Sequence, residues 1–386
     1  MTVRITWDRA SARRLGRQFL DTPAGTGTPV ADVVAAMPAA HAQVLSAAEL
    51  SVGVRTAGRT RADVREALWQ ADGSAATLVR THGPRGTVHL LPARELPLWS
   101  SALTAIPGTG RFAPGIRLTD TQTTEVLAAV ADALDGRTLT IDELDAAVVA
   151  RTGAWAGDRV MPAFQELWPR WRQVLHRAGQ SGDLCFGPGR GRKVTYTRPS
   201  RFTPLPAAEA LRALVHRYLR AYGPATPPDF AKWLAAPTSW ATTLFGTCAA
   251  GGEIEEVDFA GTPAWVAAGD TAFPGEPVRG VRLLPYFDAY VIAAQPRETL
   301  FPGAAYRRAL AGGQAGNHPV LLVDGVVAGV WHQRRRGRRT TVTVEPLGGL
   351  TPRQERELGE RVERVGEVLQ ARPELVIGTV TTGPHA

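Results

Sequence analysis

The sequence is poor in cysteine. Only Cys185 and Cys248 occur in 386 residues, and neither lies in a CxxC or Cys/His spacing. Disulfide frameworks, structural zinc sites and iron–sulfur clusters all depend on such spacings. We therefore expect a chain that uses no metal and no other cofactor.

Long hydrophobic runs are also missing. No stretch approaches the length needed to span a bilayer, and the N-terminal MTVRITWDRASARRLGRQFL carries charges where a signal peptide has an apolar core. We expect a cytoplasmic protein with no membrane partner. Hydrophobic residues make up 44% of the chain and charged residues 21%, which is sufficient for a folded interior. The length favours two to four modules.

Lysine is nearly absent too. Only Lys193 and Lys232 occur among 44 basic residues, so arginine supplies almost all of the formal net charge of +8. Part of this bias reflects GC-rich codons. Arginine is nevertheless the side chain best suited to bidentate phosphate contacts, which favours a polyanionic partner. On charge alone, a basic protein without such a partner is an equal alternative.

Three segments repeat one plan. Each has helices, then two short strands around a turn or a glycine-rich loop, a pattern typical of a helix-turn-helix with a wing. In the first segment we expect helices near residues 7–20, 29–37 and 61–69, and strands at 78–80 and 87–90.

The other two repeats follow the same order. The second is expected to have helices from residue 121 and over 140–149, with strands at 184–186 and 193–196 around the loop GPGRGR. The third is expected to have helices over 208–223, 226–235 and 239–245, then the strands EIEEVDF and AWVAAG.

Beyond Asp270 the chain becomes β-rich. Asp324-Gly325 is a turn signal, and a helix is expected from about 352 to 371. We expect a small sheet with one covering helix, and an α+β fold class of tandem winged helix-turn-helix motifs followed by this sheet. The expected divisions are residues 1–118, 119–203, 204–270 and 271–386.

Two hairpin tips are strongly basic. A glycine-rich loop can follow a phosphate backbone closely, and clustered arginines repel one another unless an anion gathers them. The ordinary alternative for each is a solvated hairpin end, and we favour nucleic-acid contact. The residues are Arg190, Arg192 and Lys193 at the first tip, and Arg334, Arg335, Arg336, Arg338 and Arg339 at the second.

A short polar motif follows the helix expected over residues 29–37 of the first repeat. Ser46 and Glu49 have the spacing of a capping box, which predicts a helix through about residue 54. In extended chain, residues two apart share a face, so His41 and Gln43 can both face a ligand near the helix N-terminus. A loop histidine and a capping amide are the common alternatives.

Six blocks in order over nearly the whole chain resemble the AlkZ/YcaQ-like DNA glycosylases, which are also described as winged-helix DNA-binding domain proteins. The blocks are HAQVLSAAELSVGVR, LVRTHGPRGTVHLLP, LCFGPGRGRKVTYT, RYLRAYGPATPPDFAKWL, LLPYFDAYVI and LLVDGVVAGVWHQRRRGRRTTVTVEP. The resemblance implies a C-shaped arrangement of the winged helices. It also implies hydrolysis of the N-glycosidic bond of N7-alkylated purines, including bulky antibiotic adducts.

The resemblance assigns the catalytic pair. The family's Gln-x-Gln motif falls on His41-Ala42-Gln43, where Gln43 matches and His41 looks like a His-x-Gln branch linked to self-resistance against DNA-alkylating natural products. Whether His41 only positions water or also accepts its proton stays open. A glutamine amide can orient water, and a histidine with a pKa near 6.5 can accept a proton.

The remaining polar residues near the motif have lesser roles. Asp32 and Glu49 are the nearest carboxylates, and for Asp288 a structural role is favoured over a catalytic one. In the first wing we expect DNA contacts from Arg80, His82 and Arg85.

Two other functions compete with base excision by a monomer acting on double-stranded DNA. A non-catalytic winged-helix regulator would bind an operator and leave alkylated DNA intact. A drug-sequestering protein would bind the free antibiotic without DNA. The appearance of abasic sites in alkylated DNA separates the three.

Overall fold

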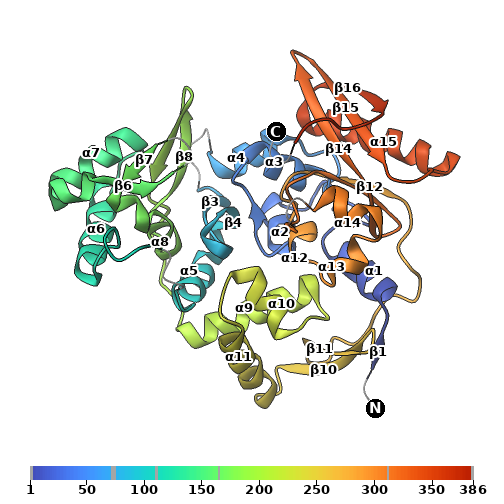
Figure 1. The fold of residues 1–386 in the computed structure, drawn as a ribbon, viewed down its shortest axis with the longest axis horizontal. Helices are drawn as coiled ribbons and strands as arrows, with labels where there is room; N and C mark the ends of the chain where they lie inside the picture. Colours follow the sequence, from blue (N-terminus) through green and yellow to red (C-terminus); the bar gives the residue numbers. More distant parts are fainter. Residues whose placement is uncertain (1–2, 71–74, 109–111, 164–165, 311–312, 384–386) are drawn as a thin grey trace.

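Three winged units and a C-terminal sheet make up the molecule. The computed structural model describes residues 3–70, 75–108, 112–163, 166–310 and 313–383. In Figure 1 the first unit lies at the centre, with the second at the left, the third below and the C-terminal sheet at the upper right. Two long hairpins, one from the second unit and one from the C-terminal sheet, point upward on either side of the centre and give a C-shaped outline.

The first unit has the strand order of a winged helix. Its elements are α2 (Val30–Ala36), β2 (Ala40–His41), α3 (Leu45–Gly53), α4 (Arg61–Leu68), β3 (Leu78–His82) and β4 (Val88–Pro92). The last strand pairs antiparallel with both others, giving the order β2-β4-β3. The helices expected over 29–37 and 61–69 and the two wing strands are confirmed. The brief β2 closes the sheet and was not expected.

The second unit repeats this order. Its elements are α6 (Asp120–Ala133), β5 (Leu139–Thr140), α7 (Ile141–Thr152), α8 (Leu175–Ser181), β8 (Cys185–Arg190) and β9 (Lys193–Thr197), with the sheet order β5-β9-β8. Thr119 and Thr140 start α6 and α7 with complete capping boxes. An extra hairpin, β6 (Arg159–Pro162) and β7 (Leu167–Pro169), lies between α7 and α8.

The third unit is a winged helix with a minimal first strand. Its elements are α9 (Ala207–Tyr222), α10 (Pro227–Leu234), α11 (Thr238–Ala250), β10 (Ile254–Phe259) and β11 (Thr262–Ala267). The first strand is reduced to Ala225, which exchanges backbone hydrogen bonds of 3.1 and 2.9 Å with Trp265 of β11. The helices and both strands predicted here are confirmed.

The N-terminal segment crosses the molecule to this third unit. The strand β1 (Arg4–Ile5) pairs parallel with β10, and α1 (Trp7–Arg17) follows it. On α1, the buried Arg14 donates from Nη2 to the backbone oxygen of Pro224 at 2.8 Å and from Nη1 to that of Gln295 at 2.6 Å. The first residues of the chain therefore hold the third unit against the C-terminal part.

The C-terminal sheet has five strands in chain order. They are β12 (Val281–Leu284), β13 (Val320–Val323), β14 (Val326–Arg336), β15 (Arg339–Pro346) and β16 (Arg372–Ile377), and only β15 and β16 run parallel. The expectation of one covering helix is wrong. Besides α15 (Pro352–Leu369), there are α12 (Ala289–Ala293), α13 (Arg297–Leu300) and α14 (Ala304–Ala309). Asp288 is the N-cap of α12, and its side chain accepts a hydrogen bond from Tyr290 N.

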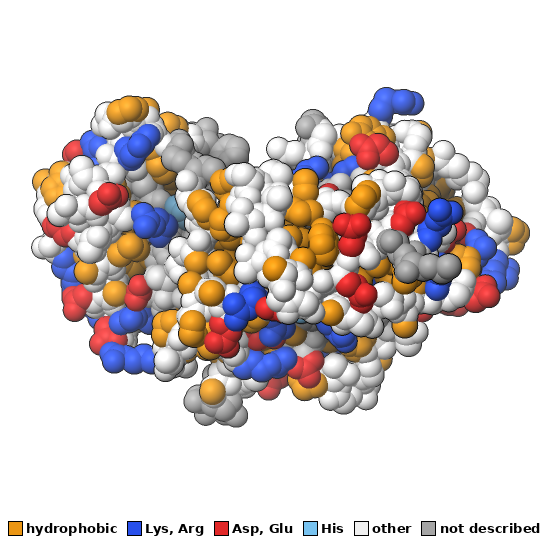
Figure 2. Space-filling view, turned by 90° about the horizontal axis from the view of Figure 1, so that it is seen from below, with side chains coloured by type: hydrophobic (Ala, Val, Ile, Leu, Met, Phe, Trp, Pro, Cys, Tyr) orange, Lys and Arg blue, Asp and Glu red, His pale blue; other side chains and the backbone are white. Residues whose placement is uncertain are grey.

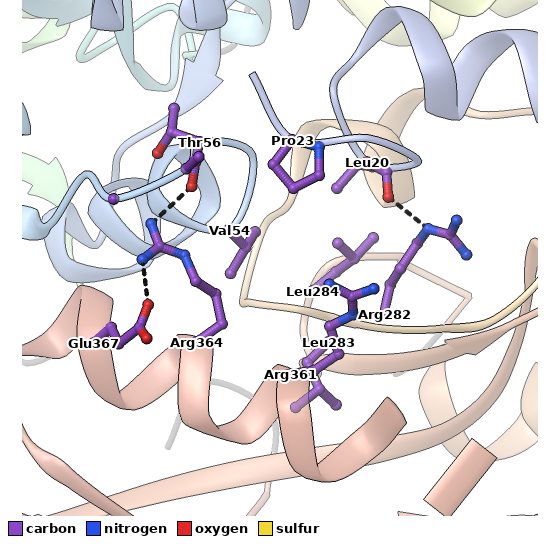
Figure 3. A pocket seen from close by; sticks show the side chains of 12 residues that line it. Leu20, Pro23, Val54, Thr56, Arg282, Leu283, Leu284, Arg361, Arg364 and Glu367 are labelled. Atoms are coloured by element: carbon purple, nitrogen blue, oxygen red, sulfur yellow. Dashed lines mark hydrogen bonds and ion pairs between the residues drawn. The ribbon is translucent and has the colours of Figure 1, made fainter. Parts of the chain in front are cut away.

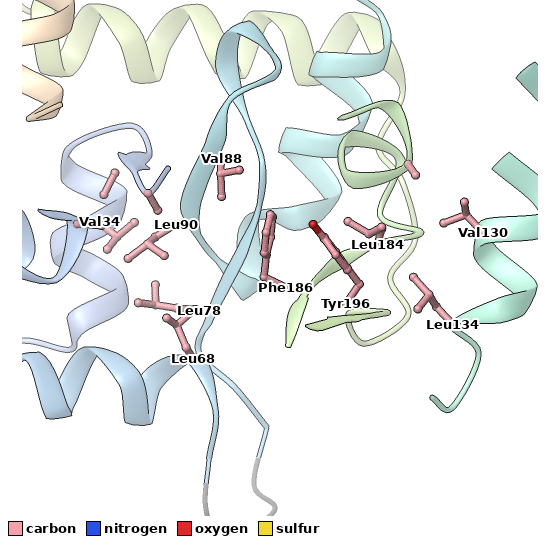
Figure 4. Packing of buried hydrophobic residues seen from close by; sticks show 14 of the residues in the cluster. Val34, Leu68, Leu78, Val88, Leu90, Val130, Leu134, Leu184, Phe186 and Tyr196 are labelled. Atoms are coloured by element: carbon pink, nitrogen blue, oxygen red, sulfur yellow. The ribbon is translucent and has the colours of Figure 1, made fainter. Parts of the chain in front are cut away.

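The first and second units share one core. Figure 4 shows apolar side chains of the first sheet, such as Leu78 and Leu90, continuing through Phe186 and Tyr196 to Val130 of α6. The third unit has its own core, which also takes in α5 (Leu96–Thr104) through Trp99. The relative placement of the units is therefore set by buried apolar contacts.

Arginines join the C-terminal part to the first unit. Arg364 of α15 donates from Nη2 to the backbone oxygens of Gly53 and Thr56 at 2.9 and 2.8 Å, where α3 ends. Arg282 of β12 donates from Nε to Leu20 O at 2.6 Å. Figure 3 shows these two arginines on opposite sides of a cavity of about 260 Å³. Both guanidinium groups are occupied by main-chain oxygens, so they serve as structural ties.

Candidate active site and DNA-binding surface

His41 lies at the point where the chain turns from α2 into the first sheet. The turn depends on Ala39, which has a left-handed φ of 82°. Tyr222 of α9 fixes it from outside by donating its hydroxyl to Met37 O at 2.8 Å. His41 then pairs with His89 of β4. The motif is therefore held by the sheet on one side and by the third unit on the other.

The imidazole of His41 is enclosed. Its ring lies 5.0 Å from the ring of His89 and 4.6 Å from that of Phe287, and only 8% of the residue's surface is exposed. Its Nδ1 is buried and has no hydrogen-bond partner among the described residues. Burial, with added repulsion from Arg85, lowers the pKa of His41 to about 3. The side chain is therefore neutral at neutral pH.

Gln43 is exposed, one residue before the N-cap of α3. Its Oε1 accepts a long hydrogen bond of 3.4 Å from Val88 N, which a competing ligand can replace at little cost. Arg80 fixes the backbone beneath, donating to Ala42 O at 3.0 and 3.2 Å and to Gln43 O at 3.4 Å. The guanidinium of Arg80 is thus committed to holding the motif in place.

The predicted capping box is wrong. The helix α3 begins at Leu45 with Val44 as its N-cap, and no side chain caps it. Glu49 is fully buried and accepts from Arg65 Nε at 2.6 Å. The Glu49 carboxylate is paired with a cation on α4 and not with the backbone at the start of α3, and the spacing of residues along the chain could not show that contact.

The other carboxylates near the motif are also paired with arginine. Asp32 contacts Arg94 at 2.6 Å, and the fully buried Asp288 receives both Nη groups of the fully buried Arg55 at 2.7 and 2.8 Å. This buried ion pair is consistent with the structural role favoured for Asp288. In the part of the chain that the structure describes, no charged side chain pairs with His41 or Gln43, in contrast to these three carboxylates.

The first wing lies between the other two winged units. Arg85 donates to Trp233 O of α10 at 2.7 Å, and Gln180 of α8 donates to Gly83 O at 3.2 Å. His82 is buried so closely against Gly179 that a Cβ there would lie 2.3 Å from its Nδ1. These contacts bury His82 and leave Arg85 half-buried against α10, so neither side chain lies on an open surface.

The second wing carries its positive charge partly neutralised. Arg190 contacts both carboxylate oxygens of Glu143 at 2.9 and 3.1 Å, and Lys193 contacts Asp142 at 2.9 Å. Arg192 is exposed, and among the described residues no carboxylate pairs with it. Of the three basic residues predicted here, Arg192 is therefore the one whose charge no described carboxylate neutralises.

The positive charge of the C-terminal hairpin is not neutralised by described carboxylates. All five of its predicted arginines are exposed around the turn between β14 and β15, and no described carboxylate forms an ion pair with them. Arg335 also approaches Arg61 at the start of α4, where repulsion from Arg335 adds to burial in lowering the pKa of Arg61. Arg61 was not foreseen as part of this basic surface, because the contact joins segments far apart in sequence. The opposite face, in Figure 2, mixes acidic and basic side chains.

Comparison with known proteins gives the family. The model of the "DNA glycosylase AlkZ-like" family matches residues 34–368. The chain belongs to the AlkZ-like DNA glycosylase family. A curated relative from Streptomyces sahachiroi, "Interstrand DNA cross-link repair glycosylase", is 34% identical over 345 residues, covering 85% of this chain and 88% of the relative. The solved structure of "Streptomyces sahachiroi DNA glycosylase AlkZ" superposes with a TM-score of 0.76 at 29% identity, covering 97% of this chain and 100% of that one.

This AlkZ-like glycosylase is a DNA-repair enzyme that binds DNA. Within the described residues, no helix is both long and apolar enough to cross a membrane. Within the same residues, no three His, Cys, Asp or Glu side chains are grouped so as to hold a metal ion.

Proposed function

We propose that this glycosylase hydrolyses the N-glycosidic bond of N7-alkylated purines, above all guanine carrying bulky adducts or taking part in interstrand crosslinks. The printed name of the Streptomyces relative, an interstrand crosslink repair glycosylase, supports this substrate class. The enzyme is monofunctional and monomeric in this proposal. It serves repair of alkylated DNA and self-resistance to alkylating antibiotics.

The chemistry needs few groups from the protein. Alkylation at N7 makes the purine cationic, so the base leaves as a neutral molecule without a general acid. The enzyme has to steady an oxocarbenium-like sugar and aim one water at its anomeric carbon. A neutral imidazole and an amide can hold that water by hydrogen bonds. Because the enzyme supplies no general acid, normal bases, which leave poorly, stay in the DNA.

The observation that carries the proposal is the placement of His41 and Gln43 together before α3, with Asp32, Glu49 and Asp288 each occupied by an arginine. Because the pKa of His41 is lowered to about 3, the imidazole takes up a proton poorly. We therefore propose that His41 positions the attacking water and does not accept its proton. Nδ1 is enclosed, so Nε2 is the nitrogen proposed to face the water.

Phosphate affinity is assigned mainly to the C-terminal hairpin, with a smaller share for Arg192 of the second wing. The hairpin arginines are exposed and without carboxylate partners, as a phosphate-binding surface requires. Their position beside Arg61 extends this surface to the first unit.

The test uses three duplexes, which carry N7-methylguanine, a bulky N7-guanine adduct or an interstrand crosslink. Purified protein is incubated with each, and abasic sites are counted after strand cleavage at high pH. We expect abasic sites in all three, none in the unmodified duplex, and large losses in His41→Ala and Gln43→Ala. Tight binding to these duplexes without any abasic product would favour a non-catalytic DNA reader. Binding of free antibiotic alone would favour sequestration.

A further inference from the structure

The ring that covers His41 comes from the C-terminal part of the chain. Phe287 lies in the loop between β12 and α12, and its ring centroid is 4.6 Å from that of His41, at an interplanar angle of 36°. The two residues are far apart in sequence and belong to different units. The enclosure of His41 therefore depends on how the C-terminal part docks on the first unit.

The backbone of Phe287 is held in a conformation that a bulky residue seldom adopts. Its φ is 55°, in the left-handed region, which costs of order 1 kcal/mol unless the surroundings enforce it. Phe287 N donates to Gly316 O at 2.9 Å. Gly316 has a φ of 93°, which L side chains rarely adopt, and a Cβ there would lie 3.2 Å from the Phe287 Cα, so glycine favours this close approach. The ring's place is thus specified by the fold.

The residue after Phe287 provides the anchor. Asp288 accepts from Ser51 Oγ at 2.7 Å and from both Nη groups of Arg55, and its Oδ1 accepts from Tyr290 N at 3.0 Å. Ser51 lies on α3 and Arg55 directly follows that helix, which begins just after the motif. One helix therefore carries both the motif and the anchor of the ring that packs on it.

We propose that Phe287 is a positioning residue for His41, placed by the Asp288–Arg55 pair, so that the C-terminal part completes the active site. The ring fixes the tilt of the imidazole and keeps bulk water from its covered face. This inference rests on the proposed role of His41 in orienting the attacking water.

The rings of Phe287 and His89 pack against His41, and among the described residues Arg85 is the charged group that acts on the pKa of its imidazole. Without the Phe287 ring, water reaches the imidazole and the desolvation that lowers the pKa of His41 is reduced. Arg85 and His89 remain, so the pKa of His41 rises toward 6.5 without reaching it. In mild acid part of the enzyme then carries a protonated imidazole, which cannot accept a hydrogen bond from water.

The test compares Phe287→Leu and Phe287→Tyr, with Tyr306→Leu as a control at an exposed aromatic residue of the same C-terminal part. Single-turnover excision from an N7-methylguanine duplex is measured from pH 5.5 to 8, beside DNA affinity and the His41 pKa from NMR of labelled histidine. His41→Gln assigns the resonance. We expect Phe287→Leu to slow excision about tenfold or more at pH 5.5 and less at pH 8, with a raised His41 pKa and unchanged affinity. Phe287→Tyr and Tyr306→Leu are expected to keep the excision rate and the His41 pKa near the parent values.

An unchanged His41 pKa and an unchanged pH profile in Phe287→Leu would overturn the inference. Weaker binding of damaged DNA with the His41 pKa unaltered would also overturn it, because the ring would then contact substrate directly. If His41→Ala excises normally, the proposed function of His41 fails instead. The NMR measurement still reports on the ring contact in that case, so the two failures are distinguishable.

Discussion

At the scale of single residues, the first wing and the motif bring three histidines into the interior. Burial lowers the pKa of His41 and of His82 to about 3, and that of His89 well below 6.5. The sequence placed His41 before a helix N-terminus and the family resemblance made it catalytic, but an ordinary pKa near 6.5 was assumed for it. The low value follows from rings and charges contributed by β4, the first wing and the loop before α12, none of which spacing along the chain could reveal.

The catalytic pair gives the first prediction. Replacing His41 or Gln43 with alanine removes a group that orients water, so we expect the single-turnover excision rate to fall by roughly ten- to ten-thousand-fold with DNA affinity nearly unchanged. His41→Gln, which can still orient water, is expected to keep much of the rate. In the parent enzyme, the neutral imidazole predicts no loss of rate with a midpoint near pH 6.5.

Normal excision by both alanine variants would falsify the assignment of this pair. A rate that falls through pH 6.5 in the parent enzyme, together with a His41→Gln variant as slow as alanine, would instead show that the imidazole accepts a proton during the reaction.

The same histidines predict how stability depends on pH. Their folded pKa values are lowered, so the unfolded chain binds protons first as the pH falls below about 6.5, and stability is lost from there toward pH 3. Each histidine contributes a slope of about 1.4 kcal/mol per pH unit once the unfolded form is protonated. Urea unfolding at pH 8, 7, 6 and 5 measures it. His82→Gln is expected to reduce the slope by about a third; an identical slope in that variant would contradict the burial argument.

At the scale of elements, the two basic hairpins differ in what surrounds them. Arg190 and Lys193 of the second wing face Glu143 and Asp142 of the neighbouring α7, whereas the arginines between β14 and β15 face no described carboxylate. The sequence shows both tips as equally basic. The acidic residues of α7 are far enough away along the chain that their effect appears only in the folded unit.

This difference predicts unequal contributions to DNA binding. Changing the five arginines of the C-terminal hairpin to serine is expected to weaken binding to all duplexes alike and to flatten the salt dependence by about one unit of slope per lost phosphate contact. The equivalent serine variant of the second wing is expected to lose about one unit, from Arg192. Fluorescence anisotropy between 50 and 300 mM salt measures both, with the exposed Arg353→Ser as control. Equal losses from the two hairpins would refute the distinction.

Much of the element pattern could be predicted, and the exceptions share a cause. Helices, wing strands and hairpin turns followed from local periodicity and turn residues. The packing of His82 and Arg85 and the absence of a Ser46 capping box could not be predicted, because the deciding contacts with Gly179, Trp233 and Arg65 come from other elements. The catalytic pair came from resemblance, and its Phe287 cover was missed although the block LLPYFDAYVI had drawn notice for Asp288.

At the scale of the whole molecule, the buried Asp288–Arg55 pair bridges the C-terminal part and the first unit. Removing one partner leaves the other as an uncompensated buried charge, so Asp288→Ala is expected to lower the free energy of unfolding by about 3–5 kcal/mol. The exposed pair of Arg159 and Glu166 is the control, and Glu166→Ala is expected to change it by about 1 kcal/mol or less. Urea unfolding followed by circular dichroism measures both. Similar effects of the two variants would contradict the bridging role.

The N-terminal strand and α1 have a consequence for synthesis on the ribosome. Their partners, Asp258 and Phe259 in β10 and the backbone oxygens of Pro224 and Gln295, are translated more than two hundred residues later. Domains generally fold in order as they emerge. Here β1 and α1 leave the exit tunnel long before their partners, so an amphipathic, arginine-rich helix stays unpaired while more than two hundred further residues are made.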